Sequence, residues 1–474
     1  MKLRILFIVR SAPFFHYVKS IAFSLCGRGA RVRVLLDRRW TRDEKSLQPL
    51  EDLKARFGEL FEYDWAQTRS DRFRTFLFFL REIASYRFYL RMSGAQSPFY
   101  EARARSYLPS LLQRLMARIW IRGLIRSRVS GALLGLAERL SPAAVRIVEE
   151  MRSWQPDAVV AAPVNERFSS ADLEYLKAGR ALKIPTLLPV ISWDNLTTKG
   201  YIHVVPDLLL AWNEIQAEEA IRNHRIAPER IRLIGAPLFD RWFSGIAPTP
   251  DLDFRASRGI PGDTRFIAYL GSSHDLVGDE SWLVNELRRA LDQDPACIEI
   301  PLVVRPHPAN TKIFEGFSMD GVYIVPRATT LPSIDSALQL SYDTMYHASA
   351  LVGINTSAMI EALIVGKPVI AFLAPRYLGT QSETQHFRQL LAADAVERAE
   401  NPLEFVEIVK RILAGGDMQR EKRRRFVERF IRPLGWTRSA GDAAADVIEA
   451  ACRGSAETLV SARKFYYWRT TAKG

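Results

Sequence analysis

The sequence predicts an α/β protein built from two βα domains in tandem. Short apolar runs alternate with helical segments along most of the chain, as expected for parallel strands buried on both faces. The 474 residues are too many for one ordinary hydrophobic core, so two domains are expected from size alone. The alternation stops at residues 245–263, where Pro, Gly and Asp are frequent, and then starts again. We therefore expect the linker in that segment.

The first domain is expected over residues 1–245. The apolar run Ile5–Val9 predicts a strand, a helical stretch follows from His16 to Arg28, and Ala30–Leu36 predicts the next strand. Strand, helix and strand at this spacing form a βαβ unit. The alternation continues with a helix at Ala171–Ala181 and with strands at Ala158–Ala162, Thr186–Ile191, Leu208–Ala211 and Ile231–Ile234.

A helical insertion is expected inside this domain, at about residues 66–145. Residues 66–130 hold 13 Arg, no Lys and only three acidic residues, together with 11 aromatic residues. Apolar residues recur there at helical spacing. Arginines that recur every fourth residue predict one basic stripe along a helix, formed by Arg114, Arg118, Arg122 and Arg126.

The second domain is expected over residues 263–435, followed by a helical tail at 436–474. Its predicted strands are Phe266–Leu270, Pro301–Val304, Val322–Val325, Ala350–Ile354 and Val369–Phe372. Its predicted helices are Glu280–Leu291, Ser357–Val365 and residues 402–431, and the tail helix is Ala440–Cys452.

Composition excludes several classes of protein. The chain is 48% hydrophobic and 25% charged, which argues against disorder and low complexity. The three cysteines stand far apart, so no zinc site or disulfide framework is expected, and a reducing compartment fits. No apolar run approaches the roughly 20 residues that span a bilayer, and the N-terminal run is too short for a signal peptide. A cytoplasmic protein is expected, and its net charge of +13 suggests acidic partners.

The strongest candidate site lies in residues 351–372. A predicted strand is followed there by Asn355, Thr356 and Ser357, which open a helix. Free N–H groups and hydroxyls at a helix N-terminus make an anion site. Glu361, one turn later, could accept hydrogen bonds from ribose hydroxyls. The alternative is an ordinary helix cap with a surface glutamate.

A second candidate is the VVRPHP segment. Arg305 ends a predicted strand there, and His307 is held between two prolines. Ligands of open α/β sheets bind beyond the carboxyl ends of the strands. Arginine reads phosphate with two hydrogen bonds, and histidine donates or carries a proton. The alternative is a rigid surface turn.

A third candidate follows the strand at 266–270. Glycine allows close backbone approach and serine donors suit a phosphate, so the loop Gly271, Ser272 and Ser273 is assigned to a donor phosphate. The alternative is a plain turn at a strand end. The chain has no GxxxxGK[ST] loop, and its two Asp-x-Asp triplets follow no apolar strand, so a metal–nucleotide site is not expected.

The first domain offers two candidates for a general base. Asp194 lies in ISWDNLTTKGY, directly after a predicted strand, with Lys199 as an anion contact. The alternative for this segment is a turn held by local side-chain bonds. His16 follows the first strand and opens the first helix, which places it at the ligand-binding edge of that domain.

These segments together resemble glycosyltransferases of the GT-B fold, and most closely the CDP-glycerol glycerophosphotransferase-like and capsule polysaccharide families. The resemblance rests on NTSAMIEALIVGKPV, on RPHP, and on GAPLFDRW at the close of the N-terminal domain, with SWDNLTTKG and YLGSS as weaker motifs. It covers residues 1–50 and about 155–450, but not the arginine-rich insertion. SAPFFH replaces the glycine-rich loop common in these families, which puts the acceptor in doubt.

The resemblance implies two Rossmann-like domains that face each other across a cleft, with a nucleotide-activated donor held mainly by the second. Thr356 and Ser357 would hold the diphosphate and Glu361 the ribose, Arg305 and His307 would meet phosphate charge, and His16 would be the base. The family usually needs no metal and no further cofactor, because basic side chains and helix dipoles stabilise the leaving diphosphate.

The expected function is transfer of a sugar or polyol-phosphate group from a nucleotide-activated donor to a surface-polysaccharide or lipid-linked acceptor. Two alternatives stay open: a sugar-nucleotide 2-epimerase, and a non-catalytic glycan-binding module. A nucleic-acid binder is not expected, because no recognition motif appears. For residues 66–130 we expect docking on an anionic membrane surface, which would place the enzyme on the inner face of the cytoplasmic membrane. The alternative is that the aromatic residues form the insertion's own core.

Overall fold

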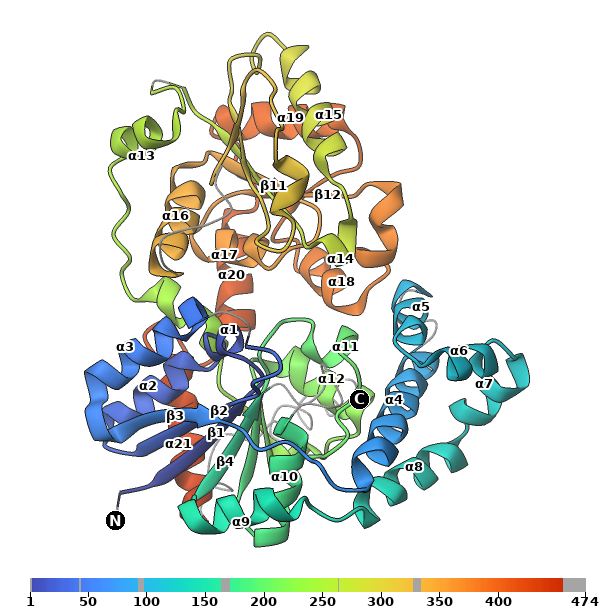
Figure 1. Cartoon of the computed structure of the whole chain (residues 1–474). Coiled ribbons are helices and arrows are strands. Elements are labelled where there is room, and N and C mark those ends of the chain that lie inside the picture. The colour runs from blue at the N-terminus through green and yellow to red at the C-terminus, as the bar shows by residue number, and fades with distance from the viewer. Residues whose placement is uncertain are drawn as a thin grey trace, which may run out of the picture. The chain divides into compact units, whose positions relative to one another are not determined.

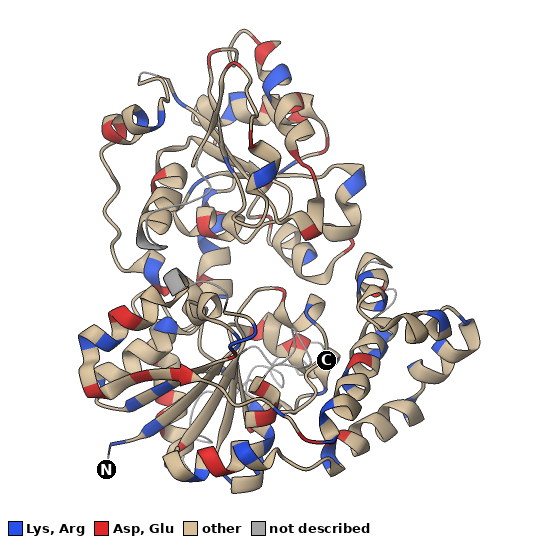
Figure 2. Ribbon diagram, in the orientation of Figure 1, with Lys and Arg blue, Asp and Glu red and all other residues tan. Residues whose placement is uncertain are grey.

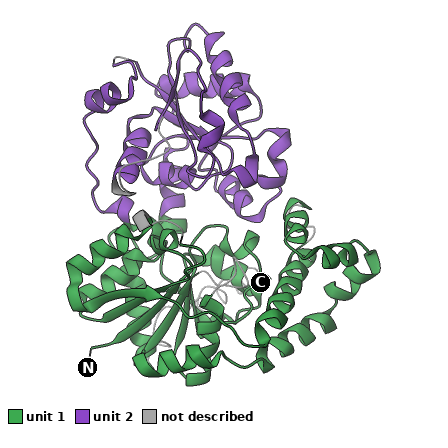
Figure 3. Cartoon of the chain, viewed as in Figure 1, with its two compact units in different colours: residues 1–240, 428–474 green, residues 241–427 purple. Residues whose placement is uncertain are grey.

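The computed structural model describes residues 2–41, 44–92, 98–162, 171–262, 264–326 and 334–454 (Figure 1). The chain divides into two compact units (Figure 3). Unit 1 comprises residues 1–240 and 428–474, and unit 2 comprises residues 241–427. The segment 245–263, expected as the linker, therefore lies inside unit 2, where it contains helix α13 (Asp251–Arg258).

Unit 1 is built on a seven-stranded parallel sheet with the strand order β3-β2-β1-β4-β5-β6-β7. The strands are β1 (Arg4–Val9), β2 (Arg31–Leu36), β3 (Phe61–Trp65), β4 (Ala158–Ala162), β5 (Thr186–Pro189), β6 (Leu208–Ala211) and β7 (Ile231–Leu233). The central strands β1 and β4 are almost wholly buried, which explains why they read as continuous apolar runs in the sequence. The sheet order changes direction between β1 and β4, since β2 and β3 lie on one side and β4 to β7 on the other.

Helices flank this sheet, as Figure 1 shows. They are α1 (Ala12–Phe15), α2 (Lys19–Gly27), α3 (Gln48–Phe57), α9 (Val145–Trp154), α10 (Ala171–Leu182), α11 (Asn195–Thr198), α12 (Glu214–His224) and α21 (Ala440–Cys452). The tail helix α21 packs against α2 and contributes Ala444 and Ile448 to the core of unit 1. The C-terminal segment therefore completes the first unit rather than following the second.

The expected helical insertion is confirmed and consists of α4 (Phe73–Arg91), α5 (Pro98–Ser106), α6 (Ser110–Met116), α7 (Ile119–Arg126) and α8 (Arg128–Leu140). It has a hydrophobic core of its own, in which Tyr86, Phe88 and Tyr100 are buried. Many of its aromatic residues therefore serve packing, as the alternative interpretation proposed. The predicted single stripe of arginines is wrong, because the backbone of Arg118 is extended (φ −82°, ψ 124°) and separates α6 from α7.

The positive charge of the insertion is partly internal. In Figure 2 its basic residues are spread over several helices. Arg81 in α4 is buried and pairs with Glu138 of α8 (2.8 Å) and Glu174 of α10 (2.7 Å). Glu174 also pairs with Arg69 (2.7 Å), and Glu138 with Lys177 (3.0 Å). This buried network ties the insertion to α10, so part of the predicted charge excess holds the fold together.

Unit 2 is built on a six-stranded parallel sheet with the order β10-β9-β8-β11-β12-β13. The strands are β8 (Ile267–Leu270), β9 (Leu302–Arg305), β10 (Val322–Ile324), β11 (Ala350–Gly353), β12 (Val369–Phe372) and β13 (Glu397–Ala399). Its remaining helices are α14 (His274–Val277), α15 (Ser281–Asp292), α16 (Ile334–His347), α17 (Ala358–Ile364), α18 (Gln385–Ala392), α19 (Pro402–Leu413) and α20 (Arg420–Phe426).

Two parallel sheets with covering helices confirm the predicted α/β class. The predicted helix from His16 to Arg28 corresponds to α2 alone, which begins at Lys19, because His16 is the C-terminal cap of the separate short helix α1. Within the described residues, every helix is too short or too polar to cross a membrane.

Candidate functional site

Three of the sequence-predicted loops follow neighbouring strands of unit 2. The loop after β8 begins at Gly271, the loop after β9 contains His307, and the loop after β11 begins at Ile354. Strands β9, β8 and β11 are adjacent and parallel, so all three loops leave the same edge of the sheet. The sheet order also reverses between β8 and β11, and open α/β sheets bind ligands at such a switch point.

Gly271 is required by the close approach of two of these loops. Its backbone N–H donates to the carbonyl oxygen of Arg305 (2.9 Å). A Cβ atom at this position would lie 2.7 Å from the backbone nitrogen of His307 and 3.0 Å from the Arg305 carbonyl oxygen. Any larger residue would push the RPHP loop away from β8. The close backbone approach expected from the sequence is therefore present, but the group that approaches Gly271 is the backbone of the RPHP loop.

Ser272 joins all three loops through a buried network. Its hydroxyl accepts from the backbone N–H of Asn355 (3.2 Å), and its own N–H donates to Glu280 (2.9 Å). Asn310, beyond the RPHP segment, donates to the Ser272 carbonyl oxygen (3.2 Å). The Asn355 side chain donates to the carbonyl oxygen of Thr380. The Ser272 hydroxyl and the Asn355 amide are thus engaged in hydrogen bonds within the protein, and both residues act by positioning the loops.

Arg305 is the residue of this cluster best able to bind an anion. Within the described part of the chain its guanidinium makes no hydrogen bond and no ion pair. Burial lowers the pKa of Arg305 from its ordinary value, the Glu361 carboxylate opposes this shift, and the Arg241 guanidinium adds to it. Partial burial of a guanidinium that contacts no carboxylate costs free energy, unless a bound anion pairs with it.

Arg241 and Glu361 complete the electrostatics of the cluster. Arg241 Nη2 lies 3.5 Å from Glu361 Oε1, and Arg241 Nε is buried without a hydrogen-bond partner among the described residues. One carboxylate therefore faces two guanidinium groups, which leaves this part of unit 2 with net positive charge. The sequence reasoning assigned Glu361 to a ribose and missed Arg241, which precedes the first strand of unit 2 by about 25 residues.

His307 is a neutral hydrogen-bond donor in this structure. Burial, together with the neighbouring Arg305 charge, lowers its pKa to about 4. Its Nδ1 accepts from the backbone N–H of Ala309 (3.1 Å), so the proton of the neutral ring is on Nε2. Nε2–H can donate to a phosphate oxygen, whereas it cannot accept a proton.

The other predicted donor residues are less tightly held. Ser273 caps the short helix α14 and Ser357 precedes α17, but neither side chain makes the capping hydrogen bond. Ser357 is exposed, while Thr356 is buried, with its hydroxyl 3.4 Å from the backbone nitrogen of Ala358. These hydroxyls lie on the loops of the cluster, and within the described residues none of the three makes a hydrogen bond to another.

Glu280 supports the cluster and was not predicted, because its role depends on the fold alone. The carboxylate is fully buried and accepts from Ser272 N–H and from the Tyr269 hydroxyl (2.8 Å). Burial raises its pKa from 4.5 to about 7, although these hydrogen bonds oppose the shift.

The raised pKa of Glu280 predicts a pH-dependent stability. Between pH 4.5 and 7 the unfolded chain ionises this group while the folded chain keeps it protonated, so stability falls as pH rises. The loss across this window is about 3 kcal/mol and stays constant above pH 7. Glu280→Gln should remove it, as measured by urea unfolding at pH 5.0 and 7.5. Glu286→Gln, on the exposed side of helix α15, which begins directly after Glu280, is the control. Equal pH dependence in wild type and Glu280→Gln would show that the group does not titrate there.

Asp194 in unit 1 is held by its own neighbours. Its carboxylate accepts from the hydroxyls of Ser192 (2.7 Å) and Thr198 (2.8 Å), and Lys199 lies 3.7 Å away. The loop is also bound to the insertion, because Tyr89 donates to the Thr198 carbonyl oxygen (2.6 Å). This geometry is that of the turn alternative, in which Asp194 shapes the loop.

His16 lies at the end of α1, next to the point where the sheet order of unit 1 reverses. Its Nδ1 contacts the carbonyl oxygen of Pro13, and a carbonyl can only accept, so Nδ1 carries the proton of the neutral ring. The lone pair is then on Nε2, which suits a general base. The loop after β4, at the same switch point, lies outside the described residues.

Metal-binding groups are not gathered in the described residues, where no three side chains of His, Cys, Asp or Glu lie close enough together to hold an ion. The basic groups Arg305 and Arg241 could instead neutralise a diphosphate directly.

Comparison with known proteins identifies the fold. No protein-family model matches the chain, and no curated protein sequence matches it significantly. Solved structures do match it. A glycosyltransferase from Rickettsia africae has a TM-score of 0.53 at 11% identity, covering 96% of this chain and 100% of that one. Two UDP-GlcNAc 2-epimerases match equally well over the same shares of both chains, that of Methanocaldococcus jannaschii (TM-score 0.53, 13% identity) and that of Neisseria meningitidis in complex with UDP-GlcNAc (TM-score 0.53, 11% identity). At these identities the likeness shows the architecture alone.

Proposed function

We propose that this chain, which has the GT-B fold, transfers a sugar or polyol-phosphate group from a nucleotide-activated donor to a surface-polysaccharide or lipid-linked acceptor. The fold is shared by glycosyltransferases and by nucleotide-sugar epimerases, such as the Neisseria enzyme bound to UDP-GlcNAc. The specific reaction is inferred from the chain's own residues.

The observation that carries the donor assignment is Arg305. It follows a central strand at the switch point of unit 2, it is half-buried, and it has no ion pair within the described residues. A diphosphate would supply the missing anion and would accept the Nε2–H of His307. Thr356 and Ser357 remain the proposed donors to the same diphosphate, and Glu361 the proposed acceptor from the ribose.

The proposed chemistry needs one base and a stabilised leaving group. A base removes the proton of the acceptor hydroxyl, and the oxygen attacks the donor carbon, or the phosphorus of a polyol-phosphate donor. The bond to the nucleotide phosphate breaks, and Arg305 and His307 stabilise the charge that develops on the leaving phosphate oxygen. His16 fits the base better than His307 does, because their tautomers are opposite. Asp194 is retained as a second candidate, although its carboxylate is already satisfied.

The insertion favours a transferase over an epimerase, because an isomerase needs no acceptor. Helix α8 exposes Val129, Leu133, Leu136 and Leu140, which at this spacing form one apolar face. The neighbouring α7 exposes Ile119 and Trp120. Exposed arginines border these helices at Arg118, Arg126 and Arg139. An apolar face bordered by arginines is complementary to the interface of an anionic membrane, where a lipid-linked acceptor would reside.

Turnover distinguishes the three functions. The purified chain is incubated with UDP-GlcNAc, CDP-glycerol or GDP-mannose, with and without a membrane extract as acceptor source. Release of the nucleotide only with the extract supports a transferase. Conversion of the sugar nucleotide without any acceptor identifies an epimerase. A chain that binds a nucleotide but turns over nothing in either arm is a non-catalytic module.

Vesicle flotation tests the membrane surface. We expect the chain to float with vesicles containing phosphatidylglycerol and to remain unbound with neutral phosphatidylcholine. Leu133→Asp with Leu136→Asp should abolish flotation, because both side chains are exposed on the apolar face of α8. Leu252→Asp, at an equally exposed leucine in α13 of unit 2, is the matched control. Flotation that is equal for the two variants would exclude α8 as the contact.

A further inference from the structure

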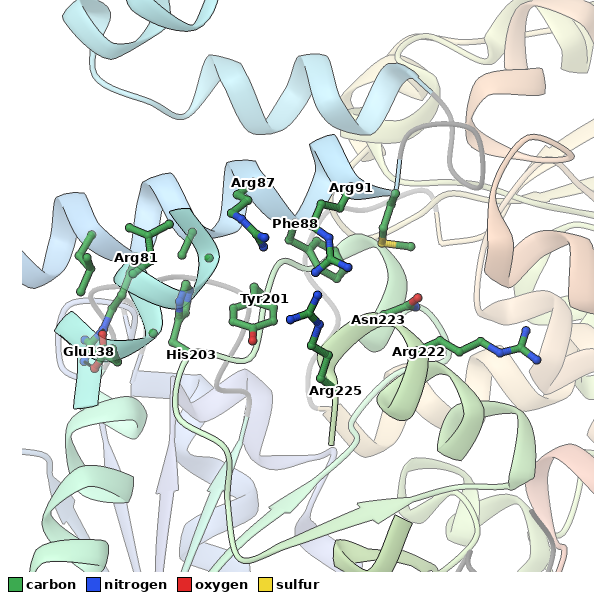
Figure 4. Close-up of a pocket in the computed structure, with 16 residues that line it drawn as sticks. Arg81, Arg87, Phe88, Arg91, Glu138, Tyr201, His203, Arg222, Asn223 and Arg225 are labelled. Atoms are coloured by element: carbon green, nitrogen blue, oxygen red, sulfur yellow. Dashed lines mark hydrogen bonds and ion pairs between the residues drawn. The ribbon is translucent and has the colours of Figure 1, made fainter. Parts of the chain in front are cut away.

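Unit 1 contains a cavity of about 190 Å³ between the insertion and helix α12. Its walls come from α4, from α8, from the Tyr201–His203 segment and from the C-terminal end of α12 (Figure 4). None of the residues assigned to the donor or to the base lines it. Figure 4 shows the guanidinium groups of Arg87, Arg91 and Arg225 converging beside Tyr201, while Arg222 points away.

Arg87 lines this cavity as a buried side chain. Its side chain is only 9% exposed, its Nη2 donates to the carbonyl oxygen of Ser127 (2.9 Å), and its Nε is buried without a hydrogen-bond partner among the described residues. A Cβ atom on Gly131 would lie 2.4 Å from Arg87 Nη2. Helix α8 therefore has a glycine at the position where any side chain would displace this guanidinium.

Arg225 occupies a helix C-terminal position at which glycine is the usual residue. It follows the last residue of α12 with a left-handed backbone (φ 59°). Left-handed C-terminal positions strongly favour glycine, and an arginine there is strained relative to it. Strained residues of this kind concentrate at functional sites, and here the strain places a guanidinium at the cavity rim.

The cavity carries uncompensated positive charge. Within the described residues neither Arg91 nor Arg225 makes an ion pair or a side-chain hydrogen bond. Burial lowers the pKa of Arg87, and the charges of Arg91 and Arg225 lower it further. The one acidic residue that lines the cavity, Glu138, is already paired with Arg81 and Lys177. Three cations thus face a shared space without a carboxylate of their own.

We infer that this cavity binds the phosphate or diphosphate group of a phosphate ester, at a site separate from the donor site. Converging guanidinium groups suit a multiply charged phosphate better than a carboxylate, because a carboxylate has one negative charge and two oxygens, too few for three cations that can each offer two donors. Part of the lining is apolar, with Leu80, Met92 and Leu134, and would pack against an organic part of the ligand. That this ligand is the acceptor rests on the proposed function, whereas phosphate binding does not.

Inorganic pyrophosphate is the first probe, titrated calorimetrically into the full chain carrying Arg305→Ala so that the donor site is silent. Arg225→Gly in this background should weaken binding at least tenfold without lowering the melting temperature, because glycine relieves the left-handed strain. Gly131→Ala should also weaken binding, by displacing Arg87. Gly123→Ala is its control, since a Cβ there meets nothing within 4 Å. Arg139→Gln is the control for charge, because Arg139 is exposed on α8 outside the cavity.

Unchanged affinity in both Arg225→Gly and Gly131→Ala, or no binding by the parent, would overturn the inference. Geranyl diphosphate separates the two sources of the ligand. Binding at least tenfold tighter than pyrophosphate assigns the site to a lipid-linked phosphate, and equal affinity assigns it to a water-soluble phosphate ester. In the otherwise native chain, Arg225→Gly should leave UDP binding unchanged. Pyrophosphate binding without any nucleotide binding would contradict the proposed function and leave this site standing.

Discussion

Replacing Arg305 with alanine should weaken nucleotide-diphosphate binding roughly 100-fold, a change of about 2.7 kcal/mol, which is within the range for charge-assisted hydrogen bonds. The physical reason is that Arg305 makes no ion pair within the described residues and lies half-buried at the end of β9. A bound diphosphate is the partner that would satisfy it. Isothermal titration of wild type and Arg305→Ala measures the difference.

The stability of the same variant separates binding from folding. If Arg305 were a structural residue, its removal would lower the melting temperature. The expected result is an unchanged or higher melting temperature, because the variant removes a half-buried, unpaired charge that is close to Arg241. Arg289→Ala, an exposed arginine of α15, is the control and should alter neither quantity. Equal affinity of Arg305→Ala and wild type would remove Arg305 from the donor site.

Breaking the buried ion network of unit 1 should cause the largest loss of stability. Glu174 accepts from Arg69 and from Arg81 at 2.7 Å each, and all three side chains are buried. Glu174→Gln removes the carboxylate that Arg69 and Arg81 share, so that each buried guanidinium keeps a single acidic partner, Asp71 and Glu138 respectively. We expect a loss of about 3 kcal/mol, at the lower end of the range for breaking a buried ion pair. Thermal unfolding should show a melting temperature lower by roughly 10 °C for a unit of this size.

The exposed pair Arg222–Glu218 is the matched control for this prediction. It lies within one helix, with an Arg222 side chain that is 72% exposed, so Glu218→Gln should cost less than about 1 kcal/mol. The pKa of Glu138, the other carboxylate of the network, also depends on its paired cations. Burial opposes ionisation of Glu138, but Arg81 and Lys177 outweigh it and lower its pKa to about 2. A loss in Glu174→Gln no larger than that in Glu218→Gln would show that the network contributes nothing.

The sequence predicted the strands of both sheets well because buried parallel strands are continuous apolar runs. The edge strands Phe61–Trp65 and Glu397–Ala399 were missed, since neither is a continuous apolar run. The break between α6 and α7 was also missed, because the spacing of Arg114 and Arg118 is helical although the backbone at Arg118 is not. The spacing of residues along the sequence does not reveal a single extended residue between two helices.

The candidate site was predictable only in part. Arg305, Gly271 and Asn355 could be found as polar or glycine residues directly after apolar runs. That their loops are neighbours depends on the order β9-β8-β11, which no local pattern encodes. Glu280 and Arg241 act through contacts with residues far away in the chain, so their roles follow only from the fold. The excess of arginine was visible in the sequence, but its division between buried pairs and the cavity of unit 1 was not.

Calorimetric titration of the full chain with UDP, CDP, GDP and CMP tests the central claim most directly. The claim is that the switch point of unit 2 holds the diphosphate of a nucleotide. It predicts micromolar binding of at least one nucleoside diphosphate, weaker binding of the monophosphate CMP than of CDP, and loss of the strongest binding in Arg305→Ala. Absence of binding for all four nucleotides at millimolar concentration would contradict it.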